Sequence, residues 1–357
     1  MFLEPLKDLE KISQAVGNRP DLVQGGGGNT SVKLDDNKMA VKASGFKLKE
    51  ITPNEGYVVV DYQKIRQYHQ QADLSENRDF EKESGEFVRA SVIPMEGLKP
   101  LRPSVEAGFH SILLKHVIHT HPVYSNMICC SKNGQELADS IFSVKEYGFV
   151  WIPYINPGFM LTLSMQQKIS EYKQQTGKFP QVIFMENHGL VVTADTADAA
   201  ISLHEDVIRT IRQYFHMDEP FPVIKIESAG DGAFKSKTQY LIDYFKGSDI
   251  TLSFFENTAL YPDQLVYLNG NIAVNGSSQK LNINTVTGEI LYRTNEKEAL
   301  TMEETLLGFV YVVESIRKNN LPLKTMSDRE TDFIRNWESE QYRKSLLGNS
   351  ATKEKKP

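Results

Sequence analysis

The sequence has few of the features that mark secreted or membrane-spanning proteins. Only two cysteines occur among its 357 residues, and because Cys129 and Cys130 are adjacent, they cannot form an ordinary structural disulfide with each other. No stretch of bilayer length is free of charge, and the first residues carry acids in place of an apolar signal segment. We therefore expect a cytoplasmic protein with buried, reduced thiols and no membrane partner.

Basic residues are also fewer than acidic ones. Forty Lys and Arg residues stand against 46 Asp and Glu residues, which gives a net charge of −6, and no basic stripe alternates with aromatic residues. Nucleic acid is therefore not expected as a partner. The hydrophobic content of 40% suffices for a sizeable core, in a chain longer than one typical domain but not clearly two.

The most informative stretch that is present contains two histidines separated by one residue. His119 and His121 follow an apolar run at residues 112–118, which reads as a β-strand. Alternate side chains of a strand share a face, so the two imidazoles can chelate Zn²⁺ and leave room for a third ligand and a substrate oxygen. Such a pair is about as often a packed structural feature as a metal site, so the third ligand decides.

Two further residues make a metal site the better interpretation. His188 follows an apolar run and precedes Gly189, where a strand ends and side chains face a cavity. Glu106 adds a carboxylate upstream of the histidine pair. Three histidines and one carboxylate favour an open catalytic site over a closed structural one, for which cysteines are expected. His110 shares a helix face with Glu106, and either reaches the site or braces Glu106.

Four consecutive glycines, residues 25–28, precede Asn29, Thr30 and Ser31. Glycines allow positive φ and a close approach of the backbone to an anion. The phosphate-loop and dinucleotide patterns do not fit, because a strand is expected after the glycines. In isolation, a flexible hairpin loop is the simpler interpretation. A second turn, at Ser44 and Gly45, offers a hydroxyl and an N–H group to another anion oxygen.

Strand and helix patterns interleave over the first two thirds of the chain, which indicates the α/β class. The strands are expected at residues 30–34, 39–42, 57–61, 150–154 and 182–185. The helices are expected at residues 3–16, 106–114, 131–141, 163–175 and 197–215. His204 lies beside the apolar stripe of the last helix, and we interpret it as structural.

Residues 218–350 are expected to form a C-terminal α+β extension after a boundary at residues 220–222. Helices are predicted at residues 240–245, 301–317 and 328–345, and strands at residues 265–268 and 290–292. No set of ligands is recognisable there, so the extension is expected to pack on the core or to build a subunit interface. Residues 351–357 are expected to be a disordered tail.

Six short motifs, in order, resemble the class II aldolase/adducin family. They are Gly-Gly-Asn followed by Ser, Ser-Gly, Pro-Ser-x-Glu, His-x-His-Pro, Pro-Tyr-x-x-Pro-Gly and Asn-His-Gly, all within residues 1–217. Residues 151–159 most resemble the aldolase half of a bacterial rhamnulose-phosphate aldolase/alcohol dehydrogenase fusion. The resemblance implies a three-layer α/β/α sandwich with a mostly antiparallel central sheet over residues 1–217. Members of the family usually assemble as homo-oligomers, most often tetramers, so a homo-oligomer is expected here.

The resemblance also implies roles for individual residues. His119, His121 and His188 would bind one Zn²⁺ per subunit, or another divalent metal in its place. Glu106 would bind the metal when substrate is absent and would transfer protons when substrate is present. Tyr154 would be a further catalytic residue near the site. The substrate phosphate would be bound by Gly28, Asn29, Ser44, Gly45 and Ser104.

The implied activity is zinc-dependent cleavage of a ketose 1-phosphate into dihydroxyacetone phosphate and an aldehyde. Alternatives on the same site are an epimerase, a dehydratase, an oxo-acid decarboxylase or a catalytically silent metal-binding interaction protein. Glu106 favours an aldolase or dehydratase, because epimerases as a rule have Asp there. Val105 stands where the aldolases generally have a second phosphate-binding serine, and one hydrogen bond to a charged group is worth about 1.5–3 kcal/mol. The substrate anion is therefore held differently, or is a carboxylate.

Overall fold

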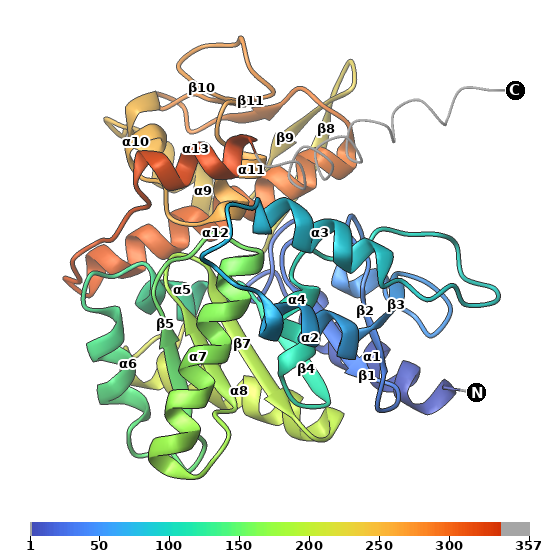
Figure 1. Ribbon diagram of the computed structural model, residues 1–357. Helices are drawn as coiled ribbons and strands as arrows, with labels where there is room; N and C mark the ends of the chain where they lie inside the picture. Colours follow the sequence, from blue (N-terminus) through green and yellow to red (C-terminus); the bar gives the residue numbers. More distant parts are fainter. Residues whose placement is uncertain (1, 337–357) are drawn as a thin grey trace, which may run out of the picture.

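A computed structural model describes residues 2–336, and a seven-stranded sheet lies at its centre (Figure 1). The strand order is β3-β2-β1-β4-β7-β6-β5. Only the β5–β6 pair is parallel among the pairs of this sheet. Its strands are β1 (Asn29–Lys33), β2 (Lys38–Lys42), β3 (Tyr57–Asp61), β4 (His116–Thr120), β5 (Phe149–Ile152), β6 (Val182–Met185) and β7 (Gly189–Ala194). The mostly antiparallel central sheet is thus confirmed.

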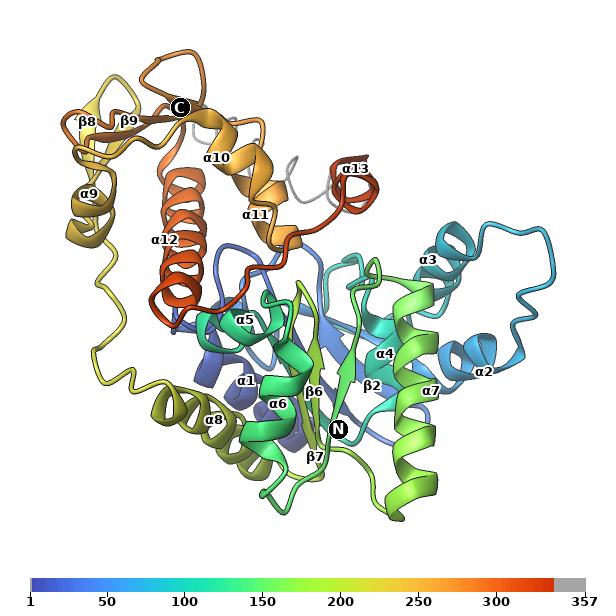
Figure 2. The same ribbon diagram turned by 90° about the vertical axis from the view of Figure 1, so that its left-hand side faces the viewer.

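Helices cover both faces of this sheet (Figure 2). One face carries α1 (Leu3–Gly17), α5 (Val123–Cys129), α6 (Gly134–Phe142) and α8 (Ala197–Tyr214). The other carries α2 (Tyr62–Gln71), α3 (Phe80–Ala90), α4 (Ala107–Ile112) and α7 (Phe159–Thr176). Adjacent strand residues alternate between the two interiors: Ile118 belongs to the core under α1 and α8, and Val117 to the core under α4 and α7. The α/β/α sandwich is therefore the observed fold.

The C-terminal part contains a second, smaller sheet with the order β10-β11-β12-β9-β8. Its strands are β8 (Ile226–Gly230), β9 (Ala233–Ser236), β10 (Ile272–Val274), β11 (Leu281–Ile283) and β12 (Ile290–Tyr292). Its helices are α9 (Gln239–Phe245), α10 (Leu252–Asn257), α11 (Pro262–Tyr267), α12 (Glu296–Lys318) and α13 (Asp328–Asn336). This α+β extension lies over one end of the central sheet (Figure 1).

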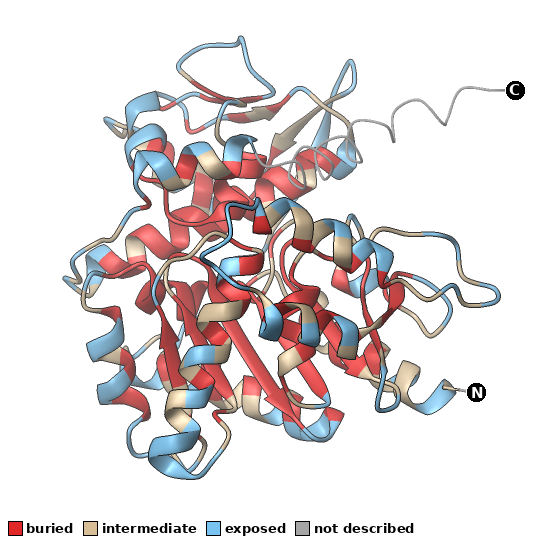
Figure 3. Cartoon of the chain, viewed as in Figure 1, coloured by how far each residue is buried: buried red, intermediate tan, exposed pale blue. Residues whose placement is uncertain are grey.

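The hydrophobic core is continuous between the sandwich and the extension. Helix α12 is buried along most of its length (Figure 3). It packs on α5, where the rings of Tyr124 and Tyr311 lie 6.1 Å apart at 85°. Buried side chains from both parts form one cluster. The carboxyl group of Glu303 in α12 also binds Tyr292 and Ser236, which ties this helix to the smaller sheet. The extension is thus part of the same folded unit as the sandwich.

Some predicted elements differ in type or position. The strand expected at residues 265–268 is wrong, because these residues lie at the end of helix α11, which starts with Pro262 at its first turn. A short apolar run does not distinguish a strand from a buried helix. The strand expected from residue 112 begins at His116, since α4 continues to Ile112.

Helix α12 starts before the expected Thr301, because the Asn295 side chain accepts the Glu298 N–H and caps it. Helix α13 agrees with the start of the helix predicted at residues 328–345. The remainder of that helix and the tail at residues 351–357 lie outside the described residues. None of the helices within residues 2–336 has the length and apolar character needed to cross a membrane.

Candidate metal centre

Three histidines converge at one end of the central sheet, from the end of β4 and from the turn between β6 and β7. His119 is near the end of β4, and His121 follows that strand, with its N–H donating to the Leu22 carbonyl at 3.0 Å. His188 lies in the tight turn between β6 and β7. Ring nitrogens of the three residues lie within 4.8 Å of one another, and all three side chains are buried. The third ligand that the sequence suggested is therefore in place.

The hydrogen bonds of two rings direct their Nε2 atoms toward the common centre. His119 Nδ1 donates to the Leu190 carbonyl at 3.0 Å, and His121 Nδ1 donates to the Asp263 carboxylate at 2.5 Å. Because these oxygens accept hydrogen bonds, each ring carries a proton on Nδ1, and Nε2 is the nitrogen that faces the common centre and can bind a ligand. Burial lowers the pKa of His119 well below its usual value, which keeps this ring neutral.

This donor set fits a divalent metal such as zinc. Two nitrogens bound at about 2.0–2.1 Å to a tetrahedral ion lie about 3.3–3.4 Å apart. The Nε2 atoms of His119 and His121 are 3.1 Å apart. Buried neutral imidazoles of this kind match the preference of Zn²⁺ for nitrogen ligands.

Glu106 places its carboxylate against the same centre. It is the N-cap residue of α4, with Oε1 at 3.2 Å from His188 Nε2 and Oε2 at 3.6 Å from His119 Nε2. The side chain is nearly completely buried. A carboxylate at this position can exchange protons with a molecule bound at the three histidines.

A chain of hydrogen bonds holds Glu106 in this position. The Asn29 amide donates to Glu106 and, at 3.3 Å, to Ser104 Oγ. His110 Nε2 donates to the Asn29 carbonyl oxygen, and the Ser31 hydroxyl lies 2.7 Å from His110 Nδ1. Burial lowers the pKa of His110 to about 3, so the ring is neutral. The question left open by the sequence is thus answered: His110 braces Glu106 through Asn29.

The polar residues expected to bind phosphate lie around Glu106. Ser104 Oγ also accepts the Glu106 N–H at 3.3 Å. The Ser44 N–H donates to the Arg102 carbonyl at 2.8 Å, which brings the Ser44–Gly45 turn alongside this segment. Gly28 has φ +67°, and a Cβ there would lie 2.6 Å from the His119 carbonyl, so only glycine fits. Phosphate binding by these groups stays a prediction.

The structure adds cationic groups that the sequence had not singled out. Lys42 is buried at the end of β2, with Nζ 3.5 Å from the Gly26 carbonyl oxygen. A cavity of about 230 Å³ next to Ser104 and Val105 is lined by Lys82, Arg89 and Arg102 together with acidic residues of α3. No pattern of spacing marked these cations as a group, because Lys42 comes from β2, Lys82 and Arg89 come from α3, and Arg102 comes from the segment that follows α3.

Tyr154 packs between the sandwich and the extension. Its ring packs against the extension residues of α11 and α13, and burial raises the pKa of its hydroxyl. Its backbone N–H donates to Glu186, which forms an ion pair with Lys324. Within residues 2–336, no hydrogen bond or ion pair links the Tyr154 side chain to the three histidines. Its catalytic role remains a prediction.

One residue at this centre was missed entirely. Asp263 belongs to the extension, where the sequence showed no ligand set, yet its carboxylate contacts His121. The only local signal was the Pro-Asp start of a helix, and nothing in it points to a histidine 142 positions away.

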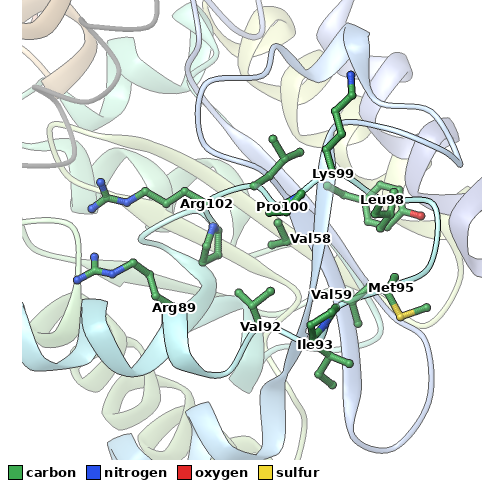
Figure 4. Close-up of a pocket in the computed structure, with 14 residues that line it drawn as sticks. Val58, Val59, Arg89, Val92, Ile93, Met95, Leu98, Lys99, Pro100 and Arg102 are labelled. Atoms are coloured by element: carbon green, nitrogen blue, oxygen red, sulfur yellow. The ribbon is translucent and has the colours of Figure 1, made fainter.

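A mainly apolar cavity lies elsewhere, between β3 and residues 92–103 (Figure 4). It measures about 630 Å³ and is lined mainly by Val, Ile, Leu, Met and Pro side chains, with Arg89, Lys99 and Arg102 at its rim. It lacks histidine and carboxylate groups. This cavity therefore offers neither a histidine ligand nor a carboxylate for proton transfer.

A family model described as Class II Aldolase and Adducin N-terminal domain matches residues 7–215, which is more than half of the chain. The chain belongs to this family. A Bacillus subtilis protein named "Uncharacterized oxidoreductase YuxG" is 28% identical over 222 residues, which cover 59% of this chain and 30% of that protein. A Haemophilus influenzae 3-oxo-tetronate 4-phosphate decarboxylase is 26% identical over 205 residues, 54% of this chain and 78% of that protein.

Solved structures of family members resemble the sandwich. The N-terminal class II aldolase domain of a Thermoplasma acidophilum protein is 24% identical, with a TM-score of 0.49 over 60% of this chain and 95% of that one. An L-fuculose 1-phosphate aldolase from Thermus thermophilus is 12% identical, with a TM-score of 0.38 over 62% of this chain and 100% of that one.

Proposed function

We propose that this chain is a zinc-dependent class II aldolase that cleaves a ketose 1-phosphate into dihydroxyacetone phosphate and an aldehyde. The observation that carries the proposal is the convergence of three buried histidines on the Glu106 carboxylate. A closed structural zinc site would have four protein ligands of fixed geometry, whereas this one combines three nitrogens with a carboxylate suited to proton transfer.

His119, His121 and His188 would hold the metal, which supplies a Lewis acid for a substrate carbonyl. Glu106 then acts on the substrate itself. The Glu106 carboxylate first accepts the proton of the hydroxyl beside the carbon–carbon bond that breaks, and this hydroxyl carbon leaves as the aldehyde. The electron pair of the broken bond stays on the carbon next to the substrate carbonyl, and this carbon takes the proton back from Glu106. Asn29 holds the carboxyl group for this transfer, and burial of the site excludes bulk water.

The substrate anion would be bound beside Glu106 by Asn29, Ser104 and the Ser44–Gly45 turn. Lys42 and the cationic side chains next to Val105 would supply positive charge in place of the missing second serine hydroxyl. The resemblance to the aldolase half of the rhamnulose-phosphate aldolase/alcohol dehydrogenase fusion supports a deoxyketose phosphate. We also propose that the chain assembles as a homo-oligomer, specifically the tetramer that the family resemblance implies.

A second candidate is decarboxylation of a phosphorylated 3-oxo acid. It is supported by the named activity of the Haemophilus influenzae relative and by Val105 in this chain. Loss of CO₂ from a 3-oxo acid leaves an electron pair on the carbon next to the carbonyl, as aldol cleavage does. The same histidines and Glu106 would therefore serve both reactions. The two activities differ in their products: an aldehyde in one case, CO₂ in the other.

The test measures zinc content and product release with the purified full-length protein. A panel of ketose 1-phosphates is assayed for dihydroxyacetone phosphate and a 3-oxo-4-phosphate acid for CO₂, with His188→Ala as the inactive control. One zinc per chain together with aldehyde release supports the aldolase, and CO₂ release supports the second candidate. Zinc without either product excludes both candidates and favours an epimerase, a dehydratase or a catalytically silent binding protein. Absence of zinc from the wild-type protein refutes the site.

A further inference from the structure

Helix α11 of the extension lies over the strand ends that carry the histidines (Figure 2). Asp263, in its first turn, is 1% exposed, and its Oδ2 lies 2.5 Å from His121 Nδ1. An ionised carboxylate is costly to bury unless it is paired. Apolar packing of α11 on the sandwich would require only an apolar side chain at this position, so the carboxylate points to a role for its contact with His121.

The same face of α11 fits against the glycine loop, residues 25–28. Asp263 and Tyr267 are four residues apart and therefore point the same way. A Cβ on Gly27 would lie 2.3 Å from Asp263 Oδ2 and 2.8 Å from His121 Nδ1, and one on Gly26 would lie 2.8 Å from Tyr267 Oη. The Gly25 N–H donates to Glu304 of α12 at 2.9 Å. The glycines thus allow the extension to approach the metal centre closely.

A second contact holds the turn that carries His188. Asn187 has φ 48°, a conformation that asparagine tolerates better than most residues. Its side-chain amide donates to the carbonyls of Leu260 at 2.8 Å and Lys324 at 3.0 Å, both in the extension. Two of the three candidate ligands are therefore oriented by residues from beyond position 217.

We infer that the C-terminal extension is an integral part of the metal centre, with Asp263 as a positioning residue for His121. By accepting the Nδ1 proton, Asp263 keeps the Nε2 lone pair of His121 directed at the ion and fixes the plane of the ring. Partners of this kind behind a ligating histidine typically contribute 10–100-fold to metal affinity. The inference rests on the proposed metal site and extends it to residues outside the family domain.

The test compares zinc affinity in Asp263→Asn and in a matched control, Asp8→Asn. Asp8 Oδ2 lies 3.0 Å from Nε2 of His116, which is a buried histidine on the same strand but not one of the three. Affinity for Zn²⁺ alone is measured by competition with a chromophoric chelator. We expect binding 10–100-fold weaker for Asp263→Asn and unchanged for Asp8→Asn.

Thermal unfolding of the metal-free proteins separates positioning from general damage. The inference is supported if the Asp263→Asn variant melts at the same temperature as the wild type but binds zinc 10–100-fold more weakly. If that variant does not fold, Asn187→Ala takes its place, with weaker zinc binding again expected. Equal affinity in the wild type and in the folded variant overturns the inference, as does an equal loss in Asp8→Asn. Wild-type protein that binds no zinc refutes the proposed function instead.

Discussion

Replacing Gly27 with alanine adds one methyl group at the point where the glycine loop, α11 and His121 meet. The φ angle of Gly27 is outside the left-handed region, so the backbone accepts alanine and only space decides the outcome. The new carbon would lie 2.3 Å from Asp263 Oδ2 and 2.8 Å from His121 Nδ1. Since these distances are about 1 Å shorter than ordinary van der Waals contacts, Asp263 or the loop must move.

The expected cost is that of overpacking, about 1–3 kcal/mol in the free energy of unfolding. Zinc affinity should also fall about 10-fold or more, because the displaced carboxylate no longer orients His121. Urea unfolding of the metal-free protein measures the first quantity, and chelator competition measures the second.

Gly85→Ala serves as the control for this experiment. Gly85 lies within α3, and the nearest atom to an added Cβ is Arg89 Nη1 at 3.7 Å, an ordinary contact. Alanine in a helix interior should therefore stabilise the protein by about 0.5–1 kcal/mol. If Gly27→Ala is as stable as the wild type and binds zinc as tightly, the close approach of α11 to the loop does not constrain the centre, and the reasoning is refuted.

Three other predictions concern catalysis, metal and pH. Glu106→Gln should lower kcat about 10²–10⁴-fold in the assays above while zinc content stays at the wild-type level; an unchanged kcat would exclude Glu106 as the proton donor. Zinc at about 100 times its Kd should stabilise the wild type by about 2.7 kcal/mol in urea unfolding and leave His188→Ala unaffected; equal responses would contradict the ligand set. Burial lowers the pKa of His204 from 6.5 to about 3. Between these two pH values, His204 is protonated in the unfolded chain but not in the folded one. The free energy of unfolding should therefore fall by up to about 1.4 kcal/mol per pH unit as the pH drops below about 6.5. Urea unfolding between pH 7.5 and 5 should show a shallower decline in His204→Gln, and identical slopes would contradict this origin.

The local patterns of the sequence predicted much of the sandwich and the histidine centre. The strands at residues 57–61 and 182–185 were predicted with their observed bounds, because their apolar runs end at clear turn residues. His119 and His121 were placed on one strand face by the two-residue period. His188 was found because a polar tip with glycine follows an apolar run, a signal that lies within a few residues.

Features that depend on distant parts of the chain could not be predicted in this way. The bracing of Glu106 by His110 through Asn29 requires β1 and α4 to be adjacent, which no single segment reveals. The role of α11 could not be predicted for two reasons. A four-residue apolar run suggested a strand, and Asp263 resembles any other acidic residue in the first turn of a helix. Long-range contacts decide both cases, whereas periodicity reports only on local structure.

The contacts between Asn187 and the carbonyls of Leu260 and Lys324 have a consequence for how the chain matures on the ribosome. The Asn187–Lys324 hydrogen bond joins residues 137 positions apart, and the Asp263–His121 contact joins residues 142 positions apart. All three histidines are therefore synthesised well before the groups that orient two of them. Closing such long loops slows folding, so a nascent chain that ends near residue 217 carries the histidines without the contacts from Asp263, Leu260 and Lys324. With the positioning roles inferred for Asp263 and Asn187, the full metal affinity would be reached only after Lys324 has been translated and packed.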